Sequence, residues 1–415
     1  MTRRDVRLSL SSSSRLTNAN KIQQTSDLVR DFFSDENNHH ATVVDESTLQ
    51  VILTSDKLCS HRLPGAQDYL DDHGTKLDLV PRVRRNLATA ISMPGFDQAA
   101  LWAALWLMPT ENLQELHDNL RQPASKADLM RLQCQLVVGV SQIPKFIRIF
   151  RGQDPDTLNE DDSNAPKAYN AGDKRNRGEA DLALERDSHK CVITDTLHPQ
   201  VCHIFPFASL KYRYQKVLPI CLDGMKKIWG IERVDDLSEK LMIHGPNETA
   251  AIDTVTNMIC LSPQLHDWWL RGYFALEPIR LWSEPLHDST PDRPDRAAKK
   301  RKIPEKWSIQ IRFDWLRKID VPMLTSKVKF SDDPITMMQE PAGEGLVRAF
   351  NATTCRQVEN GQIFTMTADS RDRLPDYDIL LLQWDLLRMW RLAGGADPTV
   401  YPLDDDFLDS SDDEV

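Results

Sequence analysis

Three polar residues in the middle of the chain have the types needed for proton transfer or metal binding. They are His203, in the run VCHIFPF, and Asn257 and His266, in the run TNMICLSPQLHDWWLRGYFAL. Histidine changes charge near neutral pH, so it can serve as a general base or as a metal ligand. His203 could equally be a buried core histidine, and Asn257 could merely begin a strand. The chemistry therefore depends on the elements that position them.

Local patterns predict two strands and a helix around these residues. CVIT and VCHI are β-prone runs separated by the turn-like DTLHPQ, which predicts a β-hairpin with His203 on its second strand. NMICLS, beginning at Asn257, is another β-prone run. Ser262 and Pro263 are typical of a helix start, because Ser accepts from first-turn N–H groups and Pro needs no donor there. The helix PQLHDWWL then presents His266 near its first turn.

The order of these residues and their context resemble the HNH endonuclease domain, and specifically the fungal-type HNH domain found in many uncharacterised fungal proteins. The resemblance covers roughly residues 181–396 and implies a β-hairpin packed on a helix around one divalent metal ion. It also implies hydrolysis of phosphodiester bonds. The segment LPDYDILLLQWDLLRMWRLAGGAD looks like the C-terminal part of such proteins. The residues that carry the resemblance are Arg186–Asp187, Cys191–Thr194, Cys202–Ile204, Pro206–Phe207, Asn257–Ser262, His266 and Arg271–Phe274.

The resemblance assigns a role to each residue of the motif. His203 occupies the general-base position, Asn257 matches the residue that holds the loop bearing the base, and His266 matches a metal ligand. Cys202 stands at a further ligand position, just before the base. The implied cofactor is one divalent ion, Mg²⁺, Mn²⁺ or Zn²⁺, acting as a Lewis acid on the phosphate. Cysteine is a soft ligand that suits Zn²⁺ better than Mg²⁺.

One position departs from the family pattern. Four residues after His266, on the same helix face, the family commonly places a second helix ligand; here the residue is Leu270, which cannot coordinate. Asp267 lies about 100° around the helix and is a poor substitute. Three functions stay open: a metal-dependent nuclease, a catalytically degraded HNH-fold protein that binds nucleic acid or regulates, and a protein-interaction scaffold. Arg186 and Arg271 are candidate phosphate contacts, although lone arginines are usually solvated.

The net charge does not exclude a nucleic-acid partner. The chain has 51 Lys+Arg and 62 Asp+Glu, a net of −11. Residues 397–415 carry eight acidic and no basic residues, and residues 152–164 carry five acidic and no basic ones, which leaves the rest of the chain at +2. Residues 181–325 hold 21 basic and 20 acidic residues, so phosphate binding must come from local clustering. We expect a nucleic-acid partner, DNA rather than RNA.

Further patterns extend the predicted HNH-like domain beyond the motif. A mostly helical insertion, roughly 208–250, separates the first strand from Asn257. Tyr273–Ile279 and Trp307–Phe313 have strand character and are joined by a basic loop, about 283–306, that is predicted to be disordered. Ile379–Gly394 is an apolar helix whose terminal glycine suits a C-cap.

The predicted fold class is α+β, with a ββα-metal HNH core preceded by a mainly helical N-terminal region. The predicted divisions are a disordered N-terminus (1–24), the helical region (25–151), a polar linker (152–180), the HNH-like domain (181–396) and a disordered acidic tail (397–415).

Cysteine usage and hydropathy bear on the compartment. Seven cysteines are spread along the chain without a CxxC pair, which is typical of a reducing, intracellular setting. The longest apolar run, Ala99–Met108, is shorter than the roughly 20 residues of a membrane span and predicts a buried helix. We expect no membrane partner, and the sequence identifies no protein partner. The basic run Lys299, Lys300, Arg301 and Lys302 is a candidate nuclear localisation signal, with the cytoplasm as the alternative.

Overall fold

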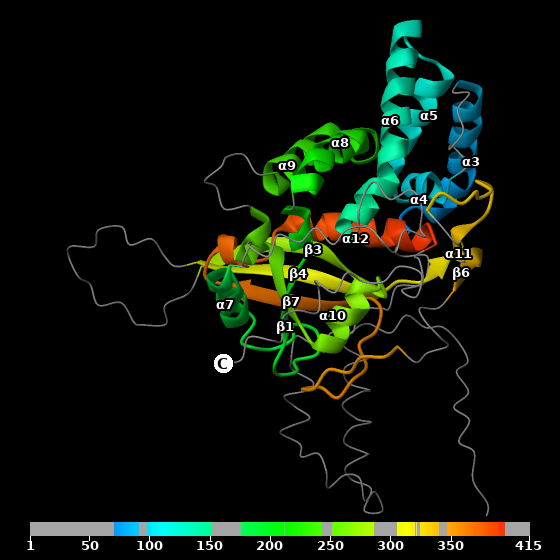
Figure 1. Cartoon of the computed structure of the whole chain (residues 1–415). Coiled ribbons are helices and arrows are strands. Elements are labelled where there is room, and N and C mark those ends of the chain that lie inside the picture. The colour runs from blue at the N-terminus through cyan, green and yellow to red at the C-terminus, as the bar shows by residue number, and fades with distance from the viewer. Residues whose placement is uncertain are drawn as a thin grey trace, which may run out of the picture. The chain divides into compact units, whose positions relative to one another are not determined.

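The computed structural model describes residues 70–90, 98–151, 176–210, 212–242, 251–285, 305–319, 321, 324–339 and 347–394 (Figure 1). The chain divides into two compact units, Met1–Cys59 and Ser60–Val415, and every described residue belongs to the second. Both predicted tails, most of the predicted linker and the basic run at 299–302 lie outside the described residues. Across the described ranges, no helix combines the length and apolar character needed to cross a membrane.

Helices fill the described part of the N-terminal region, as predicted. α4 (Ala99–Leu107) is the apolar run AALWAALWL, and every one of its residues is buried. α6 (Lys126–Phe150) begins at a cap in which the Ser125 side chain accepts from the Asp128 N–H. The other two helices of this region are α3 (His73–Ala90) and α5 (Thr110–Arg121).

α7 (Arg177–Arg186) begins earlier than the sequence predicts. The Asn176 side-chain oxygen caps the helix by accepting from the Glu179 N–H at 3.4 Å. The sequence predicts ordered structure only from Asp181, whereas α7 begins at Arg177, inside the predicted linker 152–180. The first turn of a surface helix can be entirely polar, so the composition of RNRGE alone does not distinguish it from a linker.

A ββα unit lies at the centre of the chain. β1 (Gln200–His203) pairs antiparallel with β2 (Met258–Leu261), and α10 (Pro263–Leu270) follows β2 directly. Ser262 caps α10 and Pro263 is its first residue, as predicted. The described part of the predicted insertion between the strands is helical and contains α8 (Tyr212–Trp229) and α9 (Ile231–Leu241).

The predicted hairpin of CVIT and VCHI is wrong. Residues 192–194 form a turn, and an isolated bridge joins Lys190 to Leu197. The Asp195 N–H donates to the Cys191 oxygen (2.9 Å), and Asp195 has a positive φ of 56°, which bends the chain out of an extended path. The partner of β1 is therefore β2, far away in the sequence, rather than the adjacent run.

Three antiparallel strands form a second sheet in the order β3–β4–β7. β3 (Phe274–Pro285) and β4 (Glu305–Trp315) pair until Pro285 lies opposite Glu305, so both predicted strands are confirmed and reach further into the predicted loop than expected. β7 (Gln362–Ala368) pairs with the other edge of β4. α12 (Tyr377–Leu392) packs against β3 (Figure 1). Smaller elements are β5 (Lys318–Ile319), α11 (Pro334–Met337) and β6 (Met338–Gln339).

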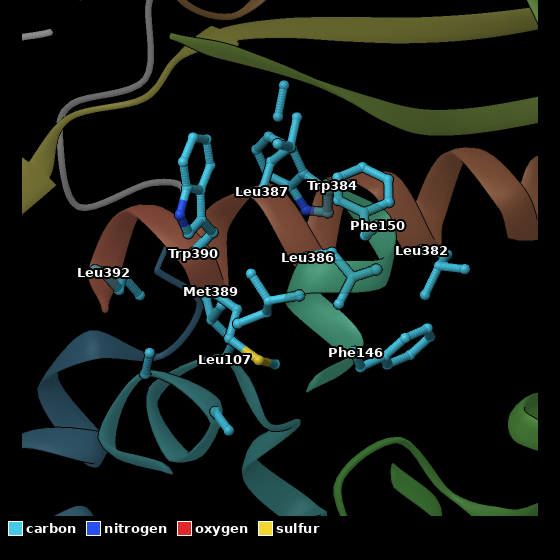
Figure 2. Close-up of a cluster of buried hydrophobic side chains, with 14 of the residues drawn as sticks. Leu107, Phe146, Phe150, Leu382, Trp384, Leu386, Leu387, Met389, Trp390 and Leu392 are labelled. Carbon is cyan, nitrogen blue, oxygen red and sulfur yellow. The ribbon is translucent and has the colours of Figure 1, made fainter. Parts of the chain in front are cut away.

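α12 is buried on nearly all sides. Thirteen of its 16 residues are buried, which is typical of a helix in the middle of a core rather than on a surface. Figure 2 shows its side chains meeting those of α4 and α6, including Phe146 and Phe150. Gly394 follows the helix with a φ of 107°, and a Cβ there would clash with the Val321 carbonyl oxygen. The predicted glycine at the helix end is thus confirmed, and the whole is an α+β fold, as predicted.

Candidate active site

His203 ends β1 and makes a defined contact with a carboxylate. Its Nε2 lies 3.0 Å from Asp253 Oδ1, and the two side chains are only 9% and 10% exposed. The second oxygen of Asp253 accepts from the Asn176 N–H at 2.8 Å, which fixes the carboxylate relative to α7. The Phe207 ring lies beside the imidazole, with centroids 5.4 Å apart. The histidine is therefore held by hydrogen bonding on one side and by an aromatic ring on another.

Asn257 holds the loop that follows His203. Its side chain is fully buried, and its Oδ1 accepts from the Phe205 N–H at 2.8 Å. Its Nδ2 donates to the carbonyl oxygens of Phe205 (2.8 Å) and Ile252 (2.7 Å), and its own carbonyl accepts from the Ile204 N–H (2.8 Å). The sequence predicts that Asn257 begins a strand, but in the structure Asn257 is the last residue of a 3₁₀ turn. It joins the loop after the histidine to the segment that carries Asp253.

The N-terminal helical region supports this loop from behind. The rings of Phe146 and Phe150, in the last turns of α6, lie 6.4 and 6.0 Å from the Phe205 ring. All three rings are buried. The loop that Asn257 fixes by hydrogen bonds is thus also packed against α6.

His266 lies on a different side of β1. Its Nδ1 donates to the Gln200 side-chain oxygen at 2.8 Å, and the Cys202 thiol donates to the Gln200 carbonyl at 3.4 Å. Successive strand residues point to opposite faces, so Gln200 and Cys202 share one face of β1 and His203 takes the other. The same division continues on β2, where Met258 packs with Val201 and α7. The structure thus brings Cys202 and His266 to one face and His203 to the opposite face.

The donors on the Cys202 face do not make up a metal centre. Within the described ranges, no three His, Cys, Asp or Glu side chains form a group that could hold an ion. Cys202 is buried, with 1% of its surface exposed, and Leu270 occupies the place of the second helix ligand. Cys260 is paired with Val201 and lies on the opposite face, and burial, reinforced by Asp187, raises the pKa of its thiol, so it is a poor ligand. The described residues therefore do not fit the predicted divalent ion.

Arg186 has a structural role, and its prediction as a phosphate contact is wrong. Its side chain is 1% exposed and donates twice to Asp187, at 2.7 and 2.8 Å. Three more bonds reach the carbonyl oxygens of Val255 (3.1 Å), Arg373 (3.0 Å) and Met258 (2.9 Å). A guanidinium has five N–H groups, so none remains for a phosphate. Arg186 instead ties α7 to the strand β2 and to the segment before α12.

Arg271 caps the end of α10 and is placed differently. Its side chain is 31% exposed, and its Nε donates to Asp267 at 2.8 Å. This hydrogen bond raises the pKa of Arg271, so the guanidinium stays charged. It remains a candidate phosphate contact.

Asp253 and Gln200 are site residues that the sequence did not reveal. Asp253 stands four positions before Asn257, and an acidic residue just upstream of a motif residue is the signal that could have singled it out. Nothing in its spacing separates it from the other acids of the chain. Gln200 is visible only once β1 is known to face α10, because its contact with His266 joins two separate elements.

Comparison with known proteins is consistent with this geometry. Residues 191–277 match the family model described as HNH endonuclease, a range that contains β1, β2 and α10. No curated protein and no solved structure matches the chain significantly. The match identifies an HNH endonuclease-like segment, and the finer assignment to a fungal-type branch stays a prediction.

Proposed function

We propose that this protein is an HNH-type nuclease that hydrolyses phosphodiester bonds of nucleic acid, with His203 as the general base. The observation that supports the proposal is that two residues hold His203 and the loop after it in place. Asp253 fixes the imidazole, and Asn257 fixes the loop after it through Phe205 and Ile204. A general base must be held within hydrogen-bond reach of the proton that it removes, and this arrangement supplies such positioning.

The contact with Asp253 defines how His203 would act. With Nε2–H donating to the carboxylate, the lone pair lies on Nδ1, which takes a proton from water. The resulting hydroxide attacks phosphorus, the bond to the leaving oxygen breaks, and that oxygen takes up a proton from solvent water. The imidazolium that forms is stabilised by the adjacent carboxylate, and Asp253 also keeps the ring in the required tautomer.

A direct assay tests the proposal. Purified protein is incubated with plasmid, single-stranded DNA or RNA, in EDTA or with Mg²⁺, Mn²⁺ or Zn²⁺. Replacing His203→Asn keeps a polar side chain but removes the base, and the cleavage rate should fall by about 10²- to 10⁴-fold. His198→Asn is the matched control, because His198 is exposed and its φ of 57° is one that Asn adopts readily. Absence of cleavage under all conditions, or equal cleavage by both variants, contradicts the proposal.

A second function is favoured by one observation, the incomplete donor set around His266. In this alternative the fold binds nucleic acid without cutting it, and Leu270 marks the lost ligand. Wild-type protein then binds DNA or RNA but leaves it intact in every metal. Replacement of Leu270→Asp restores a carboxylate on the His266 face of α10. Cleavage by this variant alone favours the second function.

A further inference from the structure

Arg151 carries a buried guanidinium that has no acidic partner among the residues that the structure describes. It follows the last residue of α6, is 8% exposed and lies over the Trp390 ring, 3.9 Å from the centroid. Within the part of the chain that the structure describes, no carboxylate pairs with it, and its Nε has no hydrogen-bond acceptor. Two other arginines with buried side chains have a carboxylate: Arg186 has Asp187 and Arg388 has Asp385.

The charges nearest to Arg151 are also positive. Burial and the proximity of Arg391 and Arg271 lower its pKa to about 9, so it remains protonated at neutral pH. Burying an unpaired charge is costly, and like charges nearby add to this cost. Stacking on Trp390 offsets only part of it. A buried cation in this situation attracts an anion strongly, because the anion would pair with the buried charge and also reduce the repulsion between the arginines.

Trp390 links Arg151 to the turn that carries Arg271. Gly272 has a φ of 66°, and a Cβ there would clash with the Trp390 ring, so the turn between α10 and β3 packs directly on α12. Arg391, the next residue of α12, lies over the Tyr273 ring (5.7 Å). Figure 2 shows Trp390 on α12, and Phe150, the residue before Arg151, on α6 where that helix meets α12. Three separate elements, α6, α12 and the turn after α10, thus bring their arginines to one place.

We propose that Arg151, together with Arg271 and Arg391, binds a phosphate group. Guanidinium groups match phosphate oxygens in geometry and charge, and Arg271 is exposed enough to receive the group from solvent. The site lies next to the His203 loop, because Phe150, which precedes Arg151, packs against Phe205. The phosphate belongs to a nucleic-acid strand or is a free phosphate ion. The proposal stands independently of cleavage by His203.

The first test is thermal unfolding of the full chain in phosphate and in chloride at equal ionic strength. Phosphate should raise the Tm of the wild-type protein by about 2 °C or more, and should not raise that of Arg151→Met. The methionine keeps an apolar side chain over Trp390, and in chloride its Tm should equal or exceed that of the wild type. Arg131→Met is the matched control: Arg131 lies on α6 with a side chain 71% exposed, and this variant should respond like the wild type.

The second test identifies the source of the phosphate. Binding of a labelled DNA duplex and a labelled single strand is measured against salt concentration. If the phosphate belongs to the strand, Arg151→Met should lower the salt slope by about 1. An unchanged slope with a lost response to free phosphate assigns the site to the free ion. Arg271→Gln, at a partly exposed position, should weaken the phosphate response as well. His203→Asn should keep the response, which separates this site from cleavage. Equal responses of wild type, Arg151→Met and Arg271→Gln in both assays overturn the proposal.

Discussion

The two faces of β1 carry the residue proposed as the general base and the residues predicted as metal ligands, and the two sets differ in completeness. On one face, His203 bonds to Asp253, and the loop after it is fixed by Asn257. On the other face, Cys202 and His266 are each bonded to Gln200, without a third ligand-type side chain near enough to form a group among the described residues.

The difference shows that a general base and a metal centre make different demands on the fold. A base needs orientation, and buried hydrogen bonds from Asn257 and Asp253 provide it at fixed distances. A metal centre needs several donors at once, and a single apolar residue, Leu270, is enough to leave it short. The HNH-like fold is therefore compatible with a well-positioned base beside a depleted ligand set.

The sharpest comparison removes the histidine from each face in turn. His203→Asn should lower cleavage by about 10²- to 10⁴-fold, because it removes the proton acceptor. His266→Gln, which can keep a hydrogen bond to Gln200, should lower it by about 10-fold or less. Initial rates on plasmid DNA measure both variants, with circular dichroism as a check on folding. An equal loss in both variants contradicts the division between the faces.

Loss of the loop clamp should be the next largest effect. Asn257→Ala leaves buried groups of Phe205 and Ile252 without partners, and should lower the free energy of unfolding by about 2–4 kcal/mol. Denaturant unfolding measures this loss. Asn351→Ala is a matched control, because Asn351 is buried and donates to Ile193 and Asp195, away from the histidine. At equal folded fraction, only the Asn257 variant should lose cleavage; an equal activity loss in both would show that stability alone is affected.

Asp253→Asn should have a smaller effect on catalysis than loss of the base itself. The amide can still contact Nε2 but no longer stabilises the imidazolium, so kcat should fall by about 10- to 100-fold with little change in KM. Steady-state kinetics on an oligonucleotide separate the two parameters. Asp223→Asn serves as a control, since Asp223 is 68% exposed and pairs only on the surface with Lys226. A rise in KM with unchanged kcat would assign Asp253 to substrate binding.

Adding a ligand-type side chain on the face of β1 that carries Cys202 should give the smallest effect, a change in affinity for a divalent ion. Leu270→Asp places a carboxylate one turn from His266, and should tighten binding of a divalent ion by about 10-fold. Isothermal titration with Mn²⁺ and Zn²⁺ measures the affinity. Leu270→Asn is matched in size but is a weaker donor. If the two variants bind metal equally, Leu270 is not the missing position.

Sequence patterns predicted those features that depend on near neighbours. The start of α10 follows from Ser262 and Pro263, and the burial of α4 from its unbroken apolar run. The paired strands β3 and β4 follow from their alternation and apolar character. In each case the signal lies within a few residues of the element that it predicts.

The failures concern contacts between distant segments. CVIT has strand propensity, but β1 pairs with β2 across the helical insertion, and local propensity does not encode that choice. Arg186 was indistinguishable from a surface arginine, because its acceptors come from residues as far away as Arg373. Asp253 was missed for the same reason: its partners His203 and Asn176 lie on other elements.

The pairing of β1 with β2 also sets an order of assembly. In the β1–β2 pair, His203 lies opposite Met258. The long segment between them must close into a loop before the strands can pair, and this closure is slow compared with helix formation. Arg186 needs the carbonyl of Arg373, and the Asp376 N–H donates to Thr256 beside Asn257 at 2.7 Å. The contacts around His203 are therefore completed only after residues near 376 have left the ribosome. A chain truncated before Arg373 lacks both these hydrogen bonds and α12, the helix that packs against α4 and α6.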